Sequence, residues 1–302
     1  MMPTTELPRI GFAGLGSMGS AMAGRLLDQE VPLTVWNRTT EPARQLADRG
    51  ALVAETVDDL VTGCDVVLLM LANGEAIDEV LGRCRGRFGR PVGGVTLVHM
   101  GTTAPAYSAG LAVDLRRAGA GYVEAPVSGS RIPAEQGLLV GMLAGDDDAV
   151  ALVRPVVDLL CRETHLCGPV PRALSTKLTV NLFLITLVTG LAEAYRFAEL
   201  SGVEVSLLSR VLEAGPMASA VSTGKLAKLV AGDFGKQAGL SDVRYNTDLI
   251  AAAARSSSSP TPLLDVSRQL FREAEGLGLG DLDMVAVVEA LRGRSRGSAL
   301  SR

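Results

Sequence analysis

In the first 168 residues, the pattern of hydrophobic and polar positions switches repeatedly between short strand-like runs and stretches with the period of a helix. Short apolar runs, each the length of one buried strand, are separated by longer amphipathic stretches such as 18–27, 104–118 and 146–160, in which apolar residues recur every three or four positions. Strands that alternate with helices in this way indicate an α/β fold built on a doubly wound, largely parallel sheet. We expect its strands at 9–13, 33–36, 51–54, 65–71, 96–100, 122–125, 138–144 and 164–167.

The pattern changes after Gly168. Pro169 and Pro171 interrupt the chain, strand-like runs stop, and the remainder has the period of helices, the first of which is unusually long. We therefore predict an α/β domain at 1–168 and an all-helical domain at 169–302, entered through that long helix. The end of the chain, 293–302, is expected to be a frayed tail. The predicted helices are 172–201, 205–213, 225–230, 240–254, 262–277 and 281–291.

Composition excludes several classes of protein. The 302 residues are 47% hydrophobic and 21% charged, which is typical of a globular chain with a large core. The net charge of -4 leaves no excess of basic residues for a phosphate backbone, so we expect no nucleic-acid partner. The longest uncharged run, 178–192, is shorter than a bilayer-spanning helix, so we predict a buried helix and no membrane association.

The cysteines and the N-terminus bear on location and metal binding. The four cysteines have no framework spacing, and the first residues lack the basic and apolar regions of a secretion signal, so we predict a cytoplasmic protein with reduced thiols. Cys161, His165 and Cys167 are close in sequence, but one histidine without a second pair of ligands is a poor metal set. We expect no metal site.

A glycine-rich turn follows the first predicted strand and opens a helix, with the spacing GxGxxG. Glycines there permit the tight turn and let a pyrophosphate approach the backbone N–H groups at the start of the helix. The turn therefore predicts a dinucleotide site. The residues expected to contact the cofactor in it are Gly14, Leu15, Gly16, Ser17, Met18 and Gly19.

The second predicted strand ends without the carboxylate that usually binds a free ribose 2′-hydroxyl. Asn37 and Arg38 stand there instead, followed by Thr39. Because a guanidinium suits a 2′-phosphate, this loop favours NADP(H) over NAD(H) as the cofactor. The alternative is that Arg38 is a solvated loop cation and that NAD(H) binds.

Lys177 is a single charge at the start of the apolar run 178–192. Asn181 follows four residues later, so both side chains project from one face of the long helix. We expect this helix to line the cleft between the domains, where burial beside a nicotinamide would lower the pKa of the lysine toward working pH. Such a lysine can give or take the proton that accompanies hydride transfer, and Asn181 can orient it. The structural alternative is a lysine that snorkels at a helix end.

Ser128, Gly129 and Ser130 follow the predicted strand 122–125 at its carboxyl end, where ligands bind in open α/β sheets. The Ser128 hydroxyl, with the backbone N–H groups of Gly129 and Ser130, would make a small cradle for a substrate carboxylate. An ordinary Ser/Gly turn is the alternative.

Several segments together, in this order along almost the whole chain, resemble the β-hydroxyacid dehydrogenase family. The family includes 3-hydroxyisobutyrate dehydrogenases and glyoxylate and semialdehyde reductases, and it is similar to the 6-phosphogluconate dehydrogenases. The resemblance implies a Rossmann domain followed by a helical domain, a homodimer or homotetramer, and reversible hydride transfer between NAD(P) and a short acid bearing a hydroxyl or aldehyde group. The segments are IGFAGLGSMGSAMAGRL, TVWNRTT, LMLANGEAI, EAPVSGS, GPVPRALSTKLTVN and LGLGDLDM.

The resemblance also implies roles for individual residues. Lys177 falls on the family's catalytic lysine and Asn181 on its asparagine partner, while Ser128 and Gly129 fall on its substrate-binding residues. Cofactor contacts resembling those of the family fall on Asn37, Arg38, Leu71, Ala72, Asn73 and Thr102.

The sequence departs from the family pattern in three places. The usual Asp-Met-Ser-Thr is HMGT at 99–102, and the usual proline after the fourth strand is Ala72. The Lys-Asp pair expected in the helical domain falls on Tyr245 and Asn246. We therefore assign Tyr245 to the substrate wall and expect a substrate less polar or larger than the smallest hydroxy acids.

Three hypotheses about function follow. The leading one is an NADP-dependent dehydrogenase or reductase that acts on a small β-hydroxyacid or its semialdehyde. The second is an NADPH-dependent imine reductase, against which Lys177 and Ser128 speak. The third is a catalytically silent NADP-binding sensor, which would have no need of Lys177, Asn181 and Ser128 together.

Overall fold

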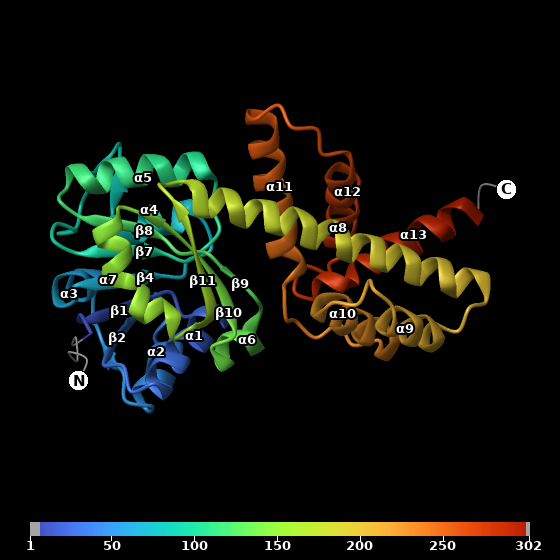
Figure 1. The fold of residues 1–302 in the computed structure, drawn as a ribbon, viewed down its shortest axis with the longest axis horizontal. Coiled ribbons are helices and arrows are strands. Elements are labelled where there is room, and N and C mark those ends of the chain that lie inside the picture. Colours follow the sequence, from blue (N-terminus) through green and yellow to red (C-terminus); the bar gives the residue numbers. More distant parts are fainter. Residues whose placement is uncertain (1–6, 300–302) are drawn as a thin grey trace. The chain divides into compact units, whose positions relative to one another are not determined.

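The computed structural model describes residues 7–299, which form two compact units that divide between Lys177 and Leu178 (Figure 1). The first unit is a sheet with helices on both faces, and the second consists of helices. The long helix α8, Arg172–Ser201, begins in the first unit and continues into the second. The predicted Rossmann-type sheet followed by an all-helical part is confirmed.

The sheet of the first unit has the strand order β11-β10-β8-β7-β4-β1-β2-β3. All neighbours from β3 to β8 pair in parallel, while β10 pairs with β8 in antiparallel fashion. The chain order reverses between β1 and β4, and a dinucleotide binds at such a switch point. The strands are β1 Ile10–Ala13, β2 Leu33–Trp36, β3 Leu52–Val53, β4 Val66–Leu69, β7 Thr96–His99, β8 Gly121–Glu124, β9 Val127–Ser128, β10 Leu139–Gly145 and β11 Cys161–Gly168, with a separate hairpin of β5 Arg83–Cys84 and β6 Arg87–Phe88.

Both faces of the sheet are covered, which explains the unbroken apolar runs in the sequence. Along β1, Ile10 and Phe12 pack in one hydrophobic core and Ala13 packs in the other, because successive side chains point to opposite faces. Four helices cover the first face: α1 Ser17–Asp28, α2 Thr40–Ala47, α6 Arg131–Gln136 and α7 Asp147–Asp158. Three cover the second: α3 Val57–Gly63, α4 Gly74–Leu81 and α5 Pro105–Arg117.

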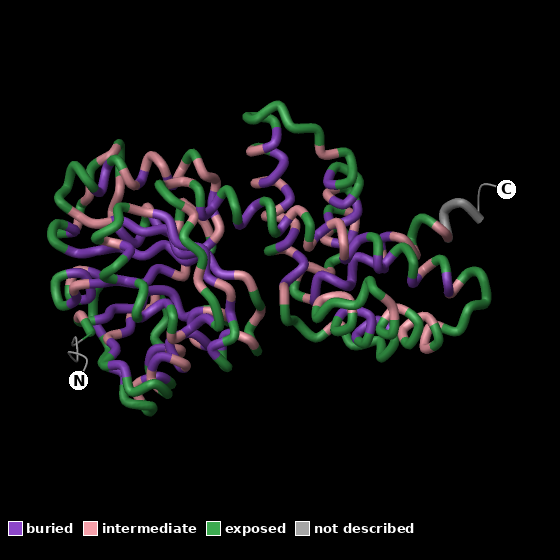
Figure 2. The backbone as a smooth tube through the Cα atoms, in the orientation of Figure 1, coloured by how far each residue is buried: buried purple, intermediate pink, exposed green. Residues whose placement is uncertain are grey.

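The last strand is longer than its sequence indicated. The prediction of 164–167 captured only half of β11, because five of its eight residues are polar, charged or glycine and most are exposed. The strand pairs only with β10, in parallel, so it is an edge strand and needs no apolar run. Figure 2 shows the contrast between the buried central strands and the exposed helical surfaces around them.

The helical unit surrounds its own hydrophobic core, in which Phe271, Met284 and Val285 are fully buried. Asp283 is also fully buried, and its carboxylate accepts hydrogen bonds from the Lys225 ammonium at 2.7 and 2.8 Å. The elements after α8 are α9 Val205–Ala214, α10 Ala220–Ala231, α11 Leu240–Ser256, α12 Pro262–Gly276, a 3-10 turn Met284–Val287 and α13 Val288–Ala299.

Two helical predictions need correction. α10 starts five residues before the predicted 225–230, because Ser219 and Ser222 form a capping box around a first turn that the apolar pattern does not mark. The predicted helix 281–291 begins only at Met284, after Asp283, whose side chain accepts from the N–H of Val285. The chain then stays helical to Ala299, within the segment for which the sequence predicted a frayed tail, and 300–302 lie outside the described residues.

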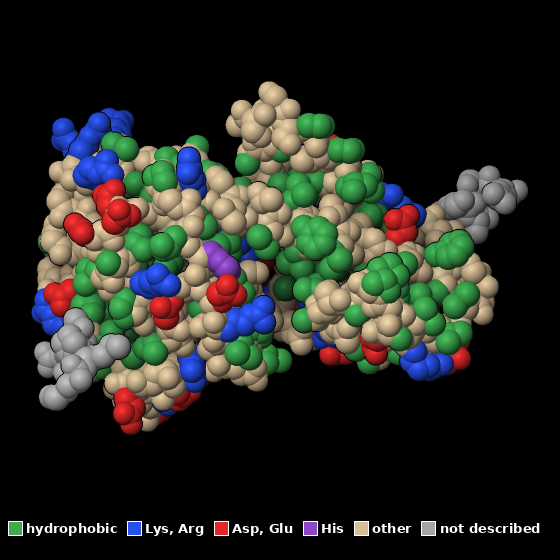
Figure 3. All heavy atoms as spheres, in the orientation of Figure 1, with side chains coloured by type: hydrophobic (Ala, Val, Ile, Leu, Met, Phe, Trp, Pro, Cys, Tyr) green, Lys and Arg blue, Asp and Glu red, His purple; other side chains and the backbone are tan. Residues whose placement is uncertain are grey.

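Helix α8 is buried along one side only. Ile185, Val188 and Ala192 are buried, whereas Phe183 and Phe197 are 68% and 71% exposed. Figure 3 shows hydrophobic side chains gathered on the face of the helical unit along which α8 runs. By length and composition alone α8 could cross a membrane, a test that core helices also pass, and 44% of its most apolar window is buried. The prediction of a buried helix therefore holds for one face.

Candidate active site

The glycine-rich turn connects β1 to α1 at the carboxyl edge of the sheet. Gly14 has φ of 93°, and a Cβ built there would lie 2.4 Å from the Met70 carbonyl oxygen. A Cβ on Gly19 would lie 1.9 Å from the Gly14 carbonyl oxygen. A Cβ on Gly16 would meet nothing within 4 Å. Two glycines thus permit close packing of turn, strand and helix, while the third leaves open space beside the backbone.

The first turn of α1 is suited to an anion. Its N-cap is Gly16, no side chain caps it, and no acidic residue lies in the first turn. The N–H groups of Ser17, Met18 and Gly19 have no acceptor within the helix, and the positive end of the helix dipole lies beside them. The residues present therefore fit the pyrophosphate of a dinucleotide.

The loop after β2 holds this turn in place. The Asn37 side-chain oxygen accepts from the N–H of Leu15 at 2.8 Å, and its amide donates to the Thr39 carbonyl and hydroxyl oxygens, both at 2.9 Å. Asn37 thus links the second strand to the glycine-rich turn. The Arg38 side chain is 80% exposed and has one weak ion pair, 3.6 Å to Glu79. Its guanidinium is therefore available to an anionic group beside the turn.

The loops after β4 and β7 pack against each other at the same edge. A Cβ on Gly101 would lie 2.6 Å from the Leu71 carbonyl oxygen, so glycine is needed for this approach. Ala72 and Thr102 lie in the same two loops, where Ala72 is exposed and Thr102 is half-buried. Asn73 caps α4 by accepting from the Ala76 N–H at 2.8 Å, which fixes the loop and engages the side-chain oxygen.

The predicted substrate cradle lies between β9 and α6. Ser128 ends β9 and pairs with Val140 of β10, and Gly129 follows with φ of 139°, a conformation that favours glycine. Ser130 is the N-cap of α6 and makes no capping hydrogen bond. Ser128 and Ser130 are half-buried and Gly129 is exposed, so the segment is open to a ligand.

Lys177 and Asn181 share one face of α8 and are 8% and 5% exposed. Within the described residues, the Lys177 ammonium has no ion-pair partner and no hydrogen bond. Burial lowers the pKa of Lys177 from 10.5 to about 8. The lysine is the last residue of the first unit, and Asn181 belongs to the second. Such a lysine can hold or release a proton near neutral pH, which a snorkelling side chain could not do.

Tyr245 and Asn246 lie on α11 in the helical unit. Both are half-buried, and the Asn246 side-chain oxygen is buried without a hydrogen-bond partner among the described residues. The structure therefore groups the cofactor and cradle residues at one edge of the sheet, and it places Asn181 and Tyr245 in the other unit.

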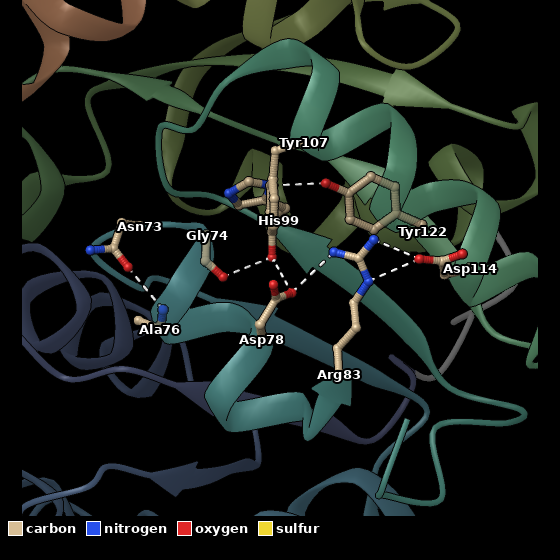
Figure 4. A network of polar contacts seen from close by, with 9 residues as sticks. All are labelled: Asn73, Gly74, Ala76, Asp78, Arg83, His99, Tyr107, Asp114 and Tyr122. Carbon is tan, nitrogen blue, oxygen red and sulfur yellow. Dashed lines mark hydrogen bonds and ion pairs between the residues drawn. The ribbon is translucent and has the colours of Figure 1, made fainter. Parts of the chain in front are cut away.

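Polar networks under this edge were not predicted from the sequence. In Figure 4, the Tyr107 hydroxyl lies within hydrogen-bond distance of Asp78 and of the Gly74 carbonyl oxygen, and Arg83 bonds to both Asp78 and Asp114. His99 lies against Tyr122 in the same view. Glu124, at the end of β8, is fully buried. A charged residue inside the otherwise apolar predicted strand 122–125 was the one sequence signal that could have singled out Glu124.

Comparisons with known proteins agree with this architecture. Residues 9–168 match the NAD binding domain of 6-phosphogluconate dehydrogenase, and residues 173–291 match the family described as NAD-binding of NADP-dependent 3-hydroxyisobutyrate dehydrogenase. A chloroplastic glyoxylate/succinic semialdehyde reductase of Arabidopsis thaliana is 31% identical over 284 residues, which cover 94% of this chain and 79% of that protein.

Two solved structures share the fold over nearly their full length. The crystal structure of 3-hydroxyisobutyrate dehydrogenase from Salmonella typhimurium has a TM-score of 0.82 and 23% identity, covering 93% of this chain and 99% of that one. The structure of Psf3 in complex with NADP+ and 2-OPP has a TM-score of 0.85 and 25% identity, with the same coverage of 93% and 99%.

Proposed function

The chain belongs to the β-hydroxyacid dehydrogenase family of NAD(P)-dependent oxidoreductases, and we propose that it transfers hydride between NADP(H) and a small β-hydroxyacid or its semialdehyde. The observation that carries the proposal is the Lys177 ammonium, which is buried, unpaired within the described residues and lowered in pKa to about 8. Burial of an unpaired charge is unfavourable, so a chemical role is the better explanation for it.

Lys177 is the proton donor and acceptor in this mechanism. The bound cofactor supplies or accepts the hydride. During reduction, the Lys177 ammonium donates a proton to the substrate carbonyl oxygen, and during oxidation the neutral amine takes the hydroxyl proton back. A pKa near 8 allows both forms at working pH. Asn181, one turn along the same face of α8, orients the amine without competing for its proton.

The substrate carboxylate is held by the segment 128–130. The Ser128 hydroxyl and the N–H groups of Gly129 and Ser130 are the donors, and the open backbone at Gly129 allows the carboxylate to approach. Tyr245 stands where the family pattern has a lysine, so this position carries an aromatic ring with one hydroxyl in place of a charge. We therefore assign a substrate less polar or larger than the smallest hydroxy acids.

We assign NADP(H) rather than NAD(H) as the cofactor. The exposed Arg38 guanidinium follows Asn37, which is bonded to the glycine-rich turn, and neither Asn37 nor Thr39 carries a carboxylate that would repel a 2′-phosphate. The complex of Psf3 with NADP+ supports this choice by analogy. We further propose a cytoplasmic homodimer or homotetramer.

The proposal is tested by NADPH consumption against three sets of substrates: short aldehydic acids, keto acids and cyclic imines. We expect turnover with aldehydic acids, and a gain from acyl groups bulkier than that of glyoxylate. Turnover of cyclic imines alone would favour an imine reductase. Binding of NADPH without consumption in any set would favour a silent sensor. A lower Michaelis constant for NADH than for NADPH would refute the cofactor assignment.

A further inference from the structure

The carboxylate of Glu124 joins strand β8 to the start of helix α8. Its Oε2 atom accepts from the backbone N–H groups of Ala173 and Leu174, both at 3.1 Å, and its Oε1 atom accepts from the Ser108 hydroxyl at 2.5 Å. Ala173 and Leu174 lie in the first turn of α8, whose N–H groups have no acceptor within the helix. Glu124 therefore satisfies two of these groups and places a negative charge at the positive end of the helix dipole.

A chain of buried hydrogen bonds holds the carboxylate from behind. The Ser108 hydroxyl lies 2.7 Å from the Tyr122 hydroxyl, which lies 2.8 Å from Nδ1 of His99 (the latter contact is drawn in Figure 4). His99 and Glu124 are direct neighbours across β7 and β8, so their side chains share the face of the sheet that α5 covers. All four residues are at most 7% exposed.

Proton counting gives this chain a direction. Burial raises the pKa of Glu124, whereas the bonds from Ser108 and from the two backbone N–H groups favour its ionised form. An ionised carboxylate only accepts, so Ser108 donates its one proton to Glu124 and must accept from Tyr122. Tyr122 then has no proton left for His99, so His99 Nδ1 must be the donor. The neutral imidazole therefore carries its proton on Nδ1, and its Nε2 is a bare acceptor. Nε2 is buried and has no acceptor for a proton within the described residues, which agrees with this tautomer.

Lys177 lies one turn beyond Ala173, on the same face of α8. We propose that Glu124 is a positioning residue for Lys177: it fixes the first turn of α8, and the His99–Tyr122–Ser108 chain fixes its carboxylate. This inference rests on the proposed function of Lys177 in proton transfer. It also gives a structural reason for His99, which stands where the family usually has aspartate.

Two substitutions at Glu124 separate positioning from general stability. Glu124→Ala removes the acceptor for both N–H groups, so the first turn loosens and water reaches Lys177. We expect kcat to fall about tenfold or more, with little change in the KM for NADPH. The alkaline limb of the kcat profile, set by Lys177, should move upward in pH because the ammonium is better solvated. Glu124→Gln keeps a carbonyl oxygen for the N–H groups and should restore kcat to within a few fold of wild type.

Thr56→Ala is the matched control. Thr56 caps α3 through a capping box, and α3 carries no residue of the site. The variant should have a lower melting temperature than the wild type and leave kcat and the pH profile unchanged. If Glu124→Ala lowers kcat without moving the alkaline limb, or if Glu124→Gln fails to restore kcat, the effect is structural and the positioning role is refuted.

The tautomer of His99 provides an independent readout in folded, fully active protein. The chain has two histidines, and His165 is exposed on β11, so the ring nitrogens can be assigned by ¹⁵N NMR. We expect the proton on Nδ1 of His99 in the wild type. In Glu124→Gln the amide donates to Ser108, every hydrogen bond reverses, and the proton should move to Nε2 while His165 is unchanged. A wild-type proton on Nε2 would overturn the inference.

The two proposals fail in different ways. Normal turnover of Lys177→Ala would refute the proposed function and leave the tautomer result standing. If Lys177→Ala is inactive but Glu124→Ala keeps the wild-type kcat and pH profile, only the positioning role is refuted.

Discussion

Replacement of Lys177 by methionine should make the protein more stable while it abolishes turnover. Methionine has a similar length and good helix propensity, and it carries no charge. Burial lowers the pKa of Lys177 from 10.5 to about 8. This difference corresponds to about 3 kcal/mol by which burial of the ammonium disfavours the folded state. At pH 7 the methionine variant should gain about that amount in free energy of unfolding.

The pH dependence gives the sign of the effect. Below pH 8 the lysine is protonated in both states, so the folded state bears the full cost. Between about 8 and 10.5 the folded state releases its proton while the unfolded state keeps it, so wild-type stability rises with pH. The methionine variant lacks this contribution. The difference in free energy of unfolding between Lys177→Met and the wild type should therefore shrink steadily from pH 8 toward pH 10.5.

Urea unfolding without cofactor, followed by tryptophan fluorescence, measures this gap. Trp36, the single tryptophan, lies on β2 in the same unit as Lys177. With a slope of about 2 kcal/mol/M, the midpoint should shift by about 1.5 M at pH 7. Arg116→Met removes an exposed charge on α5 and should change stability by less than about 0.5 kcal/mol. Equal stability of wild type and Lys177→Met at pH 7, or a gap that is independent of pH, would refute the reasoning.

Two further predictions concern the cofactor site. Arg38→Ala should raise the KM for NADPH about 10- to 100-fold through loss of a charge-assisted bond and leave the KM for NADH unchanged; equal effects on both cofactors would argue against a 2′-phosphate contact. Gly16→Ala, where a Cβ meets nothing within 4 Å, should keep the wild-type melting temperature but weaken NADPH binding about tenfold or more. Gly19→Ala, with a Cβ 1.9 Å from the Gly14 carbonyl oxygen, should lower both the melting temperature and the affinity for NADPH. Calorimetry measures the melting temperature and fluorescence titration the affinity, so together they distinguish the two glycine variants.

The sequence predicted the elements that its periodicity marks. Strand β1 was found because both of its faces are buried, and the bounds of α8 were predicted to the residue because prolines precede it and Gly202 follows it. β11 was half missed because it is an exposed, polar edge strand. The first turn of α10 was missed because serines form it.

The candidate site also has parts that the sequence predicts and parts that it does not. The glycine-rich turn and the pair on α8 are local patterns, so the sequence alone predicts them. The link from His99 through Tyr122 and Ser108 to Glu124 joins two strands and a helix. Its geometry depends on the register of β7 with β8, which no periodicity encodes. His99 could therefore be noted only as a departure from the family pattern.

The turnover of Lys177→Ala tests the central claim most directly. The measurement is NADPH consumption with the best aldehydic acid from the substrate screen, beside NADPH affinity by fluorescence titration. The account predicts that kcat falls about 100-fold or more, as for loss of a general acid, while the dissociation constant for NADPH stays close to that of the wild type. Near-normal kcat in this variant would contradict the account, because the buried ammonium would then not be the proton donor.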